Sequence, residues 1–140
     1  MITWKPLYDY KNYEISNTGL VRSLTEDGLV KRNIKQRNNG KEPHLFFEVY
    51  SNKKKRTIYT HKAVMEHFGK PPRNTRNGMQ RYVEHIDGVY THNEIENLRW
   101  ITHYQLYYKQ IATGKRKHKL DLYRHSPRYQ KSLKQKASSF

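Results

Sequence analysis

Alternating apolar and polar positions mark the first part of the chain and predict short strands joined by turns. Residues 13–16 alternate, the Asn-Thr-Gly segment 17–19 is typical of a tight turn, and residues 20–24 return as a second strand. Two further strands are expected at 44–50 and 56–60, with a polar, lysine-rich turn between them. The pattern therefore predicts a small antiparallel sheet.

Helix signals follow this sheet. Thr60 stands where it can N-cap a short helix over residues 61–68, and Gly69 with the two prolines after it ends that helix. Two histidines of this helix, His61 and His67, could be metal ligands, but an interior or capping role is expected for both.

A strand and a second helix are predicted further along the chain. The polar segment 73–80 reads as a linker, and residues 81–85 have the pattern of a strand. Thr102 and Gln105 form a capping box, with Thr102 at the N-cap and Gln105 three positions into the helix. Gly114 is expected to end this second helix.

Composition limits the size of the fold and excludes several chemistries. Only 34% of the 140 residues are hydrophobic, so we expect one compact unit or two very small ones, without a large core. The chain has no Cys, which excludes disulfides, thiol catalysis and a Cys-bound structural zinc. The N-terminus lacks the apolar run of a signal peptide and no segment is long enough to span a bilayer, which favours a cytoplasmic, intracellular protein.

A large positive charge indicates a polyanionic partner. Lys and Arg number 28 against 12 acidic residues, giving a net charge of +16. Nucleic acid fits this charge better than a membrane surface, because no long basic amphipathic helix is evident. A ribosomal-type or merely soluble basic protein is the alternative interpretation of this charge. The basic tail 114–140 is expected to contact DNA or to be disordered. The residues predicted to contact duplex DNA are Arg22, Lys53, Lys54, Lys55, Arg56, Arg99, Lys115, Arg116, Lys117 and Lys119.

A compact set of chemically active side chains lies between the two predicted helices. Glu84 and His85 are adjacent, the Asp87-Gly88 pair predicts a turn, and Asn97 opens the run Asn-Leu-Arg-Trp. An imidazole titrates near neutral pH and can take a proton from water. A carboxylate oxygen suits Mg²⁺, and an amide can brace a loop. These are the parts that phosphodiester hydrolysis needs.

This motif resembles that of the HNH (His-Asn-His) nucleases, in particular the homing endonucleases of phages and introns. The segment from Trp4 to Ser23, with its Ser-Asn-Thr-Gly turn, is similar to the small DNA-binding motif that precedes the nuclease core in that branch. The resemblance implies an α+β fold in three regions. Residues 1–60 would form the antiparallel DNA-binding motif and residues 61–113 a ββα-metal (His-Me finger) core, followed by the basic tail.

The family resemblance also assigns roles. It makes His85 the general base, Asn97 the brace of the loop, and Glu84 a ligand of Mg²⁺ or Mn²⁺ in a position where the family has Asp or Asn. One position departs from the pattern, because Leu106 stands where the family has a second ligand, Asn or His. Leu106 pairs with Ile101 as a hydrophobic staple, so it suits packing, and His103 is the expected substitute ligand.

Two functions of different class remain open. The first is a monomeric, metal-dependent endonuclease that nicks or cuts duplex DNA. The second is a nuclease-derived DNA-binding protein with weak or lost catalysis, which would regulate or block DNA. His85 and Asn97 favour the enzyme. Leu106, Glu84 and the loss of loop Asn residues at Val89 and His92 favour the binding protein.

Overall fold

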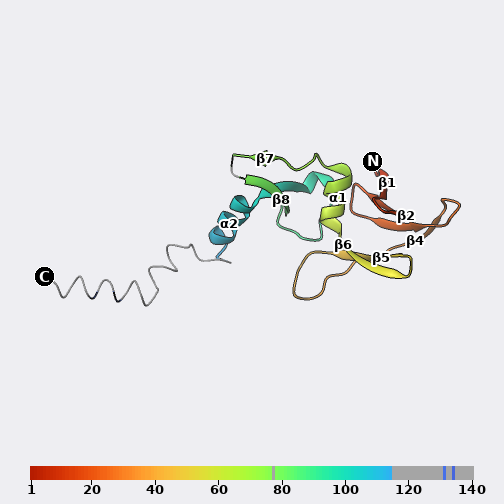
Figure 1. The fold of residues 1–140 in the computed structure, drawn as a ribbon, viewed down its shortest axis with the longest axis horizontal. Coiled ribbons are helices and arrows are strands. Elements are labelled where there is room, and N and C mark those ends of the chain that lie inside the picture. The colour runs from red at the N-terminus through yellow and green to blue at the C-terminus, as the bar shows by residue number, and fades with distance from the viewer. Residues whose placement is uncertain (77, 115–130, 132–133, 135–140) are drawn as a thin grey trace. The chain divides into compact units, whose positions relative to one another are not determined.

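The computed structural model describes residues 1–76, 78–114, 131 and 134 of the chain (Figure 1). The chain forms two units, residues 1–102 and 103–140. The strands are β1 (Trp4–Leu7), β2 (Tyr10–Ser16), β3 (Val21–Leu24), β4 (Val30–Asn33), β5 (Phe46–Ser51), β6 (Lys54–Tyr59), β7 (Asn74–Thr75), β8 (Gly78–His85) and β9 (Leu98–Thr102). The helices are α1 (Thr60–Phe68), the 3-10 turn η1 (Ile95–Asn97) and α2 (His103–Ala112). This mixed α+β architecture confirms the predicted fold class.

The N-terminal sheet is antiparallel, with the strand order β1-β2-β3-β4. The predicted hairpin is present, with Tyr13 opposite Ser23 and Ile15 opposite Val21. Its turn contains Gly19 at φ +87°, and a Cβ added there would lie 2.8 Å from the Cβ of Asn93. Glycine is therefore required at position 19 for two reasons, the left-handed backbone and the close approach of a distant loop.

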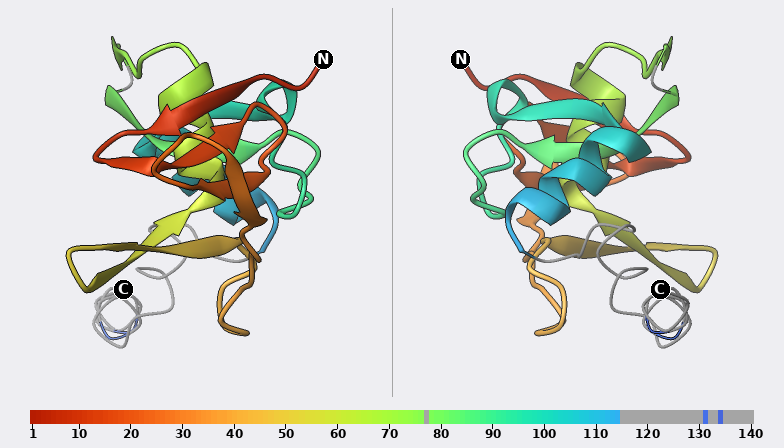
Figure 2. Two further views of the ribbon diagram at one scale, coloured as in Figure 1. Left: turned by 90° about the vertical axis from the view of Figure 1, so that its right-hand side faces the viewer. Right: turned by 90° about the vertical axis from the view of Figure 1, so that its left-hand side faces the viewer.

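Strands β5 and β6 form a separate two-stranded ribbon that projects from the rest of the first unit (Figure 2). Asn52 and Lys53 connect them, with φ values of 49° and 63°. Two successive left-handed residues are the signature of a two-residue hairpin turn whose twist matches the strands. This ribbon confirms the second predicted strand pair.

The first unit has a core that draws on segments far apart in the sequence. Ile15 of β2, Phe47 of β5 and Val64 of α1 are each at most 1% exposed and belong to one hydrophobic cluster. Leu98 of β9 joins the same cluster, and α1 lies between the N-terminal sheet and the β8–β9 pair (Figure 1). The boundaries between the three regions, which the sequence predicts at residues 60 and 113, stay predictions.

The expected N-cap role of Thr60 is wrong. Tyr59 occupies the N-cap of α1 and makes no side-chain cap hydrogen bond. The Thr60 side chain is fully buried and its hydroxyl donates to the Gln36 amide oxygen at 2.7 Å, while the Gln36 amide nitrogen donates to the Gly19 carbonyl at 2.6 Å. The need to satisfy a buried amide overrides local capping.

The linker predicted at residues 73–80 is also wrong, because this segment contains β7 and the start of β8. Asn74 pairs with Met79 and Thr75 with Gly78, which has φ +107°. Strands β1 and β4 were not predicted either. Strand β4 is exposed along its whole length and therefore lacks the apolar alternation that reveals a half-buried strand.

The second unit begins with α2, directly after Thr102, as the capping-box pattern predicts. Gly114 follows at φ +75°, and its N–H donates to the Ile111 carbonyl at 3.0 Å, which closes the helix. The predicted DNA contacts Lys115, Arg116, Lys117 and Lys119 lie outside the described residues. No helix among the described residues has the length and apolarity to cross a membrane.

We predict that Thr60→Val lowers the free energy of unfolding by roughly 1–2 kcal/mol, because the Gln36 amide oxygen loses its donor while the side-chain volume is kept. Urea unfolding measures the change. Thr57→Val, on an exposed position of β6, is the matched control and should shift stability by less than about 0.5 kcal/mol. Equal losses in both variants would contradict the buried bridge.

Candidate active site

The candidate site is built on the antiparallel pair β8–β9 and the loop that joins them. Glu84 lies opposite Arg99 and His85 opposite Leu98 in this pair. The Ile86 N–H donates to the Asn97 carbonyl at 2.7 Å, so the two strands remain bonded at the mouth of the loop. The ladder fixes the backbone of Glu84 and His85 at the end of β8.

Asn97 holds the loop through its amide group. Its Oδ1 accepts from the Asp87 N–H at 3.0 Å, and its Nδ2 donates to Asp87 Oδ1 at 2.9 Å and to the His92 carbonyl at 2.8 Å. All three bonds reach across the loop between the strands. Asn97 therefore braces the loop, and both polar atoms of its amide are hydrogen-bonded within the protein.

Asn93 determines which nitrogen of His85 carries a proton. Asn93 Oδ1 lies 2.7 Å from His85 Nε2, and both side chains are buried. An amide oxygen only accepts hydrogen bonds, so His85 donates through Nε2–H and its lone pair lies on Nδ1. Nδ1 is buried and has no hydrogen-bond partner among the described residues. The imidazole is thus oriented with its basic nitrogen free.

The contact between Asn93 and His85 cannot be predicted from the sequence. The position of Asn93 in a polar loop indicates a hydrogen-bonding side chain, but not its partner. Nothing in an isolated Asn shows that a buried ring eight positions earlier lies within reach. Its contact with Gly19 adds a second constraint, since the turn of the N-terminal hairpin packs directly on it.

Two more histidines surround His85. The ring of His61 in α1 lies 5.4 Å from the His85 ring and 4.5 Å from that of His44, measured between centroids. Tyr90 contacts both His44 and His85 edge-on. The predicted interior role of His61 agrees with its burial, whereas His44 was not singled out by any sequence signal.

Burial keeps His61 neutral. Removal from water lowers the pKa of its imidazole to about 3, and the nearby His44, His85 and Lys62 add to the shift. His92 and Asp87, by contrast, form an exposed hydrogen-bonded pair, with His92 Nδ1 2.6 Å from Asp87 Oδ2. That hydrogen bond lowers the pKa of Asp87 to about 2 and raises the pKa of His92.

Glu84 does not stand alone. The residue is 9% exposed, and its Oε2 lies 2.5 Å from the Nε of Arg99 across the strand pair. The predicted metal ligand and a predicted DNA contact are therefore ion-paired with each other. The cross-strand register explains this pairing, which the linear spacing does not reveal.

The described residues contain no group of three or more His, Cys, Asp or Glu side chains arranged to hold a metal ion. His103, the expected substitute ligand, and Leu106 both belong to α2 in the second unit. Their part in a metal site stays a prediction.

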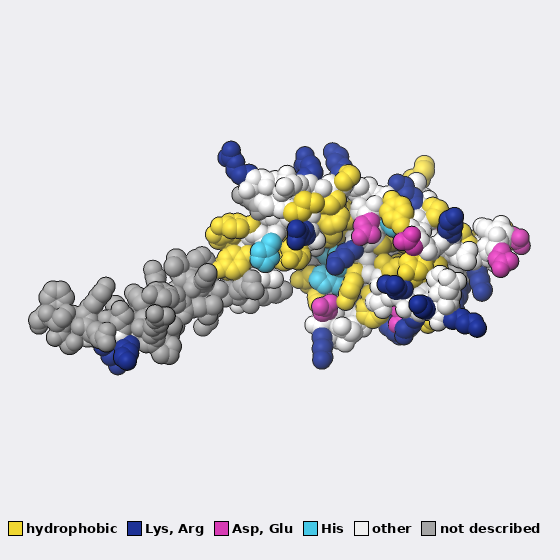
Figure 3. Space-filling model, in the orientation of Figure 1, with side chains coloured by type: hydrophobic (Ala, Val, Ile, Leu, Met, Phe, Trp, Pro, Cys, Tyr) yellow, Lys and Arg dark blue, Asp and Glu magenta, His cyan; other side chains and the backbone are white. Residues whose placement is uncertain are grey.

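The predicted DNA contacts of the first unit fall on three separate sheets, because Arg99 lies on β9. Lys53, Lys54, Lys55 and Arg56 lie together at the exposed end of the β5–β6 ribbon. Arg22 lies on β3, where its guanidinium stacks over the Trp4 ring at 3.9 Å and pairs with Glu14 at 3.1 Å. Lys and Arg side chains are spread over the visible face of the first unit (Figure 3).

Comparisons with known proteins identify the class to which this fold and site belong. Residues 3–43 match the model of the NUMOD4 motif. An uncharacterized HNH endonuclease, L247 of Acanthamoeba polyphaga mimivirus, is 32% identical over 100 residues, which are 71% of this chain and 23% of the relative. The structure of the HNH homing endonuclease I-HmuI, described for DNA binding and cleavage, superposes with a TM-score of 0.64 at 25% identity. It covers 86% of this chain and 64% of that one.

The fold is that of an HNH homing endonuclease. The chain belongs to the HNH endonuclease family and carries a NUMOD4 motif at its N-terminus. It spans less than two thirds of the length of both relatives. The family predicted from the Glu84-His85 and Asn97 motif is confirmed.

We predict that stability falls as the pH drops below about 6.5, because the unfolded state protonates His61 while the folded state does so only near pH 3. His61→Phe should reduce this acid-side loss, measured as Tm between about pH 7 and about pH 4.5. His92→Gln is the control, since the raised pKa of His92 stabilises the fold below its unfolded pKa and is lost as pH rises. An acid-side loss unchanged in His61→Phe would contradict a neutral, buried His61.

Proposed function

We propose that this protein is a DNA endonuclease that hydrolyses phosphodiester bonds in duplex DNA, with Nδ1 of His85 as the general base. The observation that carries the proposal is the bond between Asn93 Oδ1 and His85 Nε2, which leaves the lone pair on Nδ1. A base needs an accessible lone pair near neutral pH and a fixed direction, and this contact supplies the direction.

Each residue of the loop has a separate task in this reaction. His85 Nδ1 accepts a proton from the attacking water, Asn93 keeps the ring in the required tautomer, and Asn97 keeps the loop closed. His85 is only 2% exposed, so substrate binding must open a path to Nδ1. Tyr90, whose ring lies edge-on to His85 at 5.5 Å, is the cover that would move.

The residues present fit a divalent cation such as Mg²⁺. Mg²⁺ keeps several waters and is commonly held by one or two carboxylates together with substrate phosphates, so a single carboxylate at Glu84 is sufficient. When bound, the ion would neutralise charge on the scissile phosphate. Glu84 would share its carboxylate between the ion and Arg99.

The setting of the enzyme follows from its substrate. We infer a monomer that acts on DNA inside a cell, with a phage or a related mobile element as its source. The chain's charge of +16 supports DNA as the partner, because phosphate neutralisation supplies most of the affinity of basic proteins for duplexes.

A DNA-binding protein with weak catalysis is the second candidate. The pairing of Glu84 with Arg99 favours it, because a guanidinium already satisfies the carboxylate that the cation would need. Leu106 favours it as well, since an alkyl side chain cannot coordinate a metal.

We predict that the purified protein nicks supercoiled plasmid in Mg²⁺ or Mn²⁺ and that His85→Ala lowers the rate at least about 100-fold, the usual contribution of a general base. Asn93→Ala should also slow cleavage while leaving plasmid affinity unchanged. Thr91→Ala, at an exposed position of the same loop, is the control. Equal inactivity of wild type and His85→Ala with tight binding by both would reject the enzyme in favour of the second candidate.

We predict a steep loss of DNA affinity with rising salt, because binding releases counterions from the phosphates. Replacing Lys53, Lys54 and Lys55 by Ala should reduce the slope of log K against log salt concentration by about 2–3, if each neutralises one phosphate. Fluorescence anisotropy with a labelled duplex measures both slopes. A salt-independent affinity would be incompatible with duplex DNA as the partner.

A further inference from the structure

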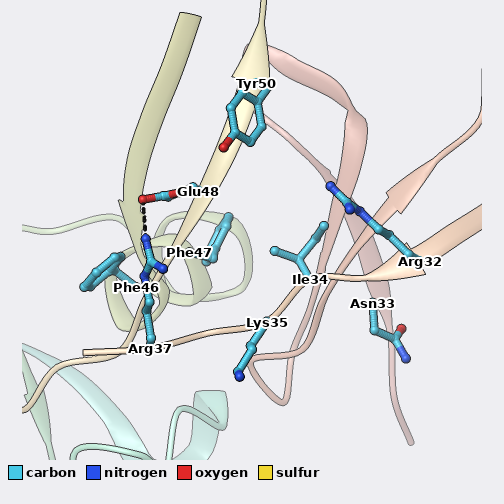
Figure 4. A pocket seen from close by; sticks show the side chains of 9 residues that line it. All are labelled: Arg32, Asn33, Ile34, Lys35, Arg37, Phe46, Phe47, Glu48 and Tyr50. Carbon is cyan, nitrogen blue, oxygen red and sulfur yellow. Dashed lines mark hydrogen bonds and ion pairs between the residues drawn. The ribbon is translucent and has the colours of Figure 1, made fainter. Parts of the chain in front are cut away.

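A pocket of about 290 Å³ lies between β4 and β5 in the first unit, away from the His85 loop (Figure 4). Its apolar floor is made by Ile34 and the buried ring of Phe47. Arg32 and Tyr50 also line the pocket and lie on the same side of Ile34 and Phe47 in this view (Figure 4). The candidate active site uses none of these residues, and Arg32, Ile34 and Lys35 lie within the segment that matches the NUMOD4 motif.

The charge of the pocket favours an anion. Three cations, Arg32, Lys35 and Arg37, line it together with one acid, Glu48. Glu48 is already paired with Arg37 at 2.7 Å and with Lys55 at 3.5 Å. Arg32 and Lys35 have no ion pair within the part of the chain that the structure describes, so their charge is available to a ligand.

The aromatic side of the pocket favours a flat ligand. Tyr50 is 55% exposed, so the face of its ring is accessible to a ligand. Its backbone N–H donates to the Tyr13 hydroxyl at 3.1 Å, which holds the end of β5 in place. An exposed ring in the same pocket as Arg32 and Lys35 combines a stacking surface with a phosphate site.

An unstacked nucleotide has the chemistry that matches both sides. The bases of an intact duplex are stacked and expose only their edges in the grooves, so duplex DNA would use the cations but not the face of Tyr50. A base turned out of the stack presents its flat face to an aromatic ring while its phosphate meets Arg or Lys. The pocket lies close to the lower limit of about 300 Å³ for ligand sites, which suits one nucleotide.

We propose that this pocket binds one unstacked nucleotide of a DNA strand, with the base on Tyr50 and the phosphate on Arg32 and Lys35. The inference shares with the proposed function only the assumption that DNA is the partner, and it does not require cleavage. It adds a preference for DNA that is distorted or unpaired at one position.

The test compares two labelled duplexes of the same sequence, one perfect and one with a single bulged 2-aminopurine, bound to the full chain without divalent metal. Wild type should bind the bulged duplex roughly 10-fold more tightly, as expected for one base stacked on an aromatic ring. The 2-aminopurine fluorescence should fall as the base stacks on Tyr50. Tyr50→Ala should remove both effects, and Tyr50→Phe should keep them.

Two charge variants separate the pocket from general electrostatics. Lys35→Ala should reduce the preference for the bulged duplex, whereas Lys31→Ala, an exposed β4 position that does not line the pocket, should weaken binding to both duplexes equally. Melting curves check that each variant is folded. If Tyr50→Ala melts at a lower temperature than wild type, the result with Lys35→Ala decides the test.

The outcomes distinguish this proposal from the proposed function. Equal affinity of wild type for both duplexes, or an equal loss on both in Tyr50→Ala and Lys35→Ala, would overturn the nucleotide pocket. A preserved preference for the bulged duplex in a protein that never nicks plasmid would support the pocket and reject the endonuclease.

Discussion

The close packing of the Gly19 turn against Asn93 is the constraint on which the site depends. A Cβ at Gly19 would lie 2.8 Å from the Cβ of Asn93, and the Ile95 N–H donates to the Asn17 carbonyl at 2.9 Å beside it. Asn93 in turn holds Nε2 of His85. A turn in the N-terminal hairpin therefore sets the position of the loop that holds the imidazole. The N-terminal motif and the candidate site are thus mechanically connected.

The loop between β8 and β9 places its polar side chains in two different environments, one buried and one exposed. Around His85 the environment is buried and aromatic, and burial keeps His61 uncharged. A few residues away, Asp87 and His92 form an exposed hydrogen-bonded pair, which lowers the pKa of Asp87 to about 2 and raises the pKa of His92. Burial fixes the orientation of the His85 ring, while the exposed pair and Asn97 hold the loop. The separation lets a small protein place a titratable ring inside its core without placing a charge there.

Sequence patterns predicted the parts of the fold that local chemistry dictates. The β2–β3 hairpin and the β5–β6 ribbon follow from alternation and turn residues, and the start of α2 follows from the capping box. Strand β4 escaped prediction because it is exposed throughout, and Thr60 was assigned to a cap because its buried partner, Gln36, is 24 positions away. In the site, the motif identified Glu84, His85 and Asn97. The contacts that define their chemistry, with Arg99, Asn93 and His44, depend on register and packing that a linear pattern does not contain.

The shared core has a consequence for how such genes recombine. Leu7, Tyr13, Ile15 and Val21 all lie within the residues that match the NUMOD4 motif, and they pack in one cluster with Val64 and Leu98 of the region that carries the nuclease residues. An exchange of this motif between two nucleases would transplant part of a hydrophobic interior along with the surface of the motif. Only donors whose buried side chains interlock with the resident ones would give a folded hybrid.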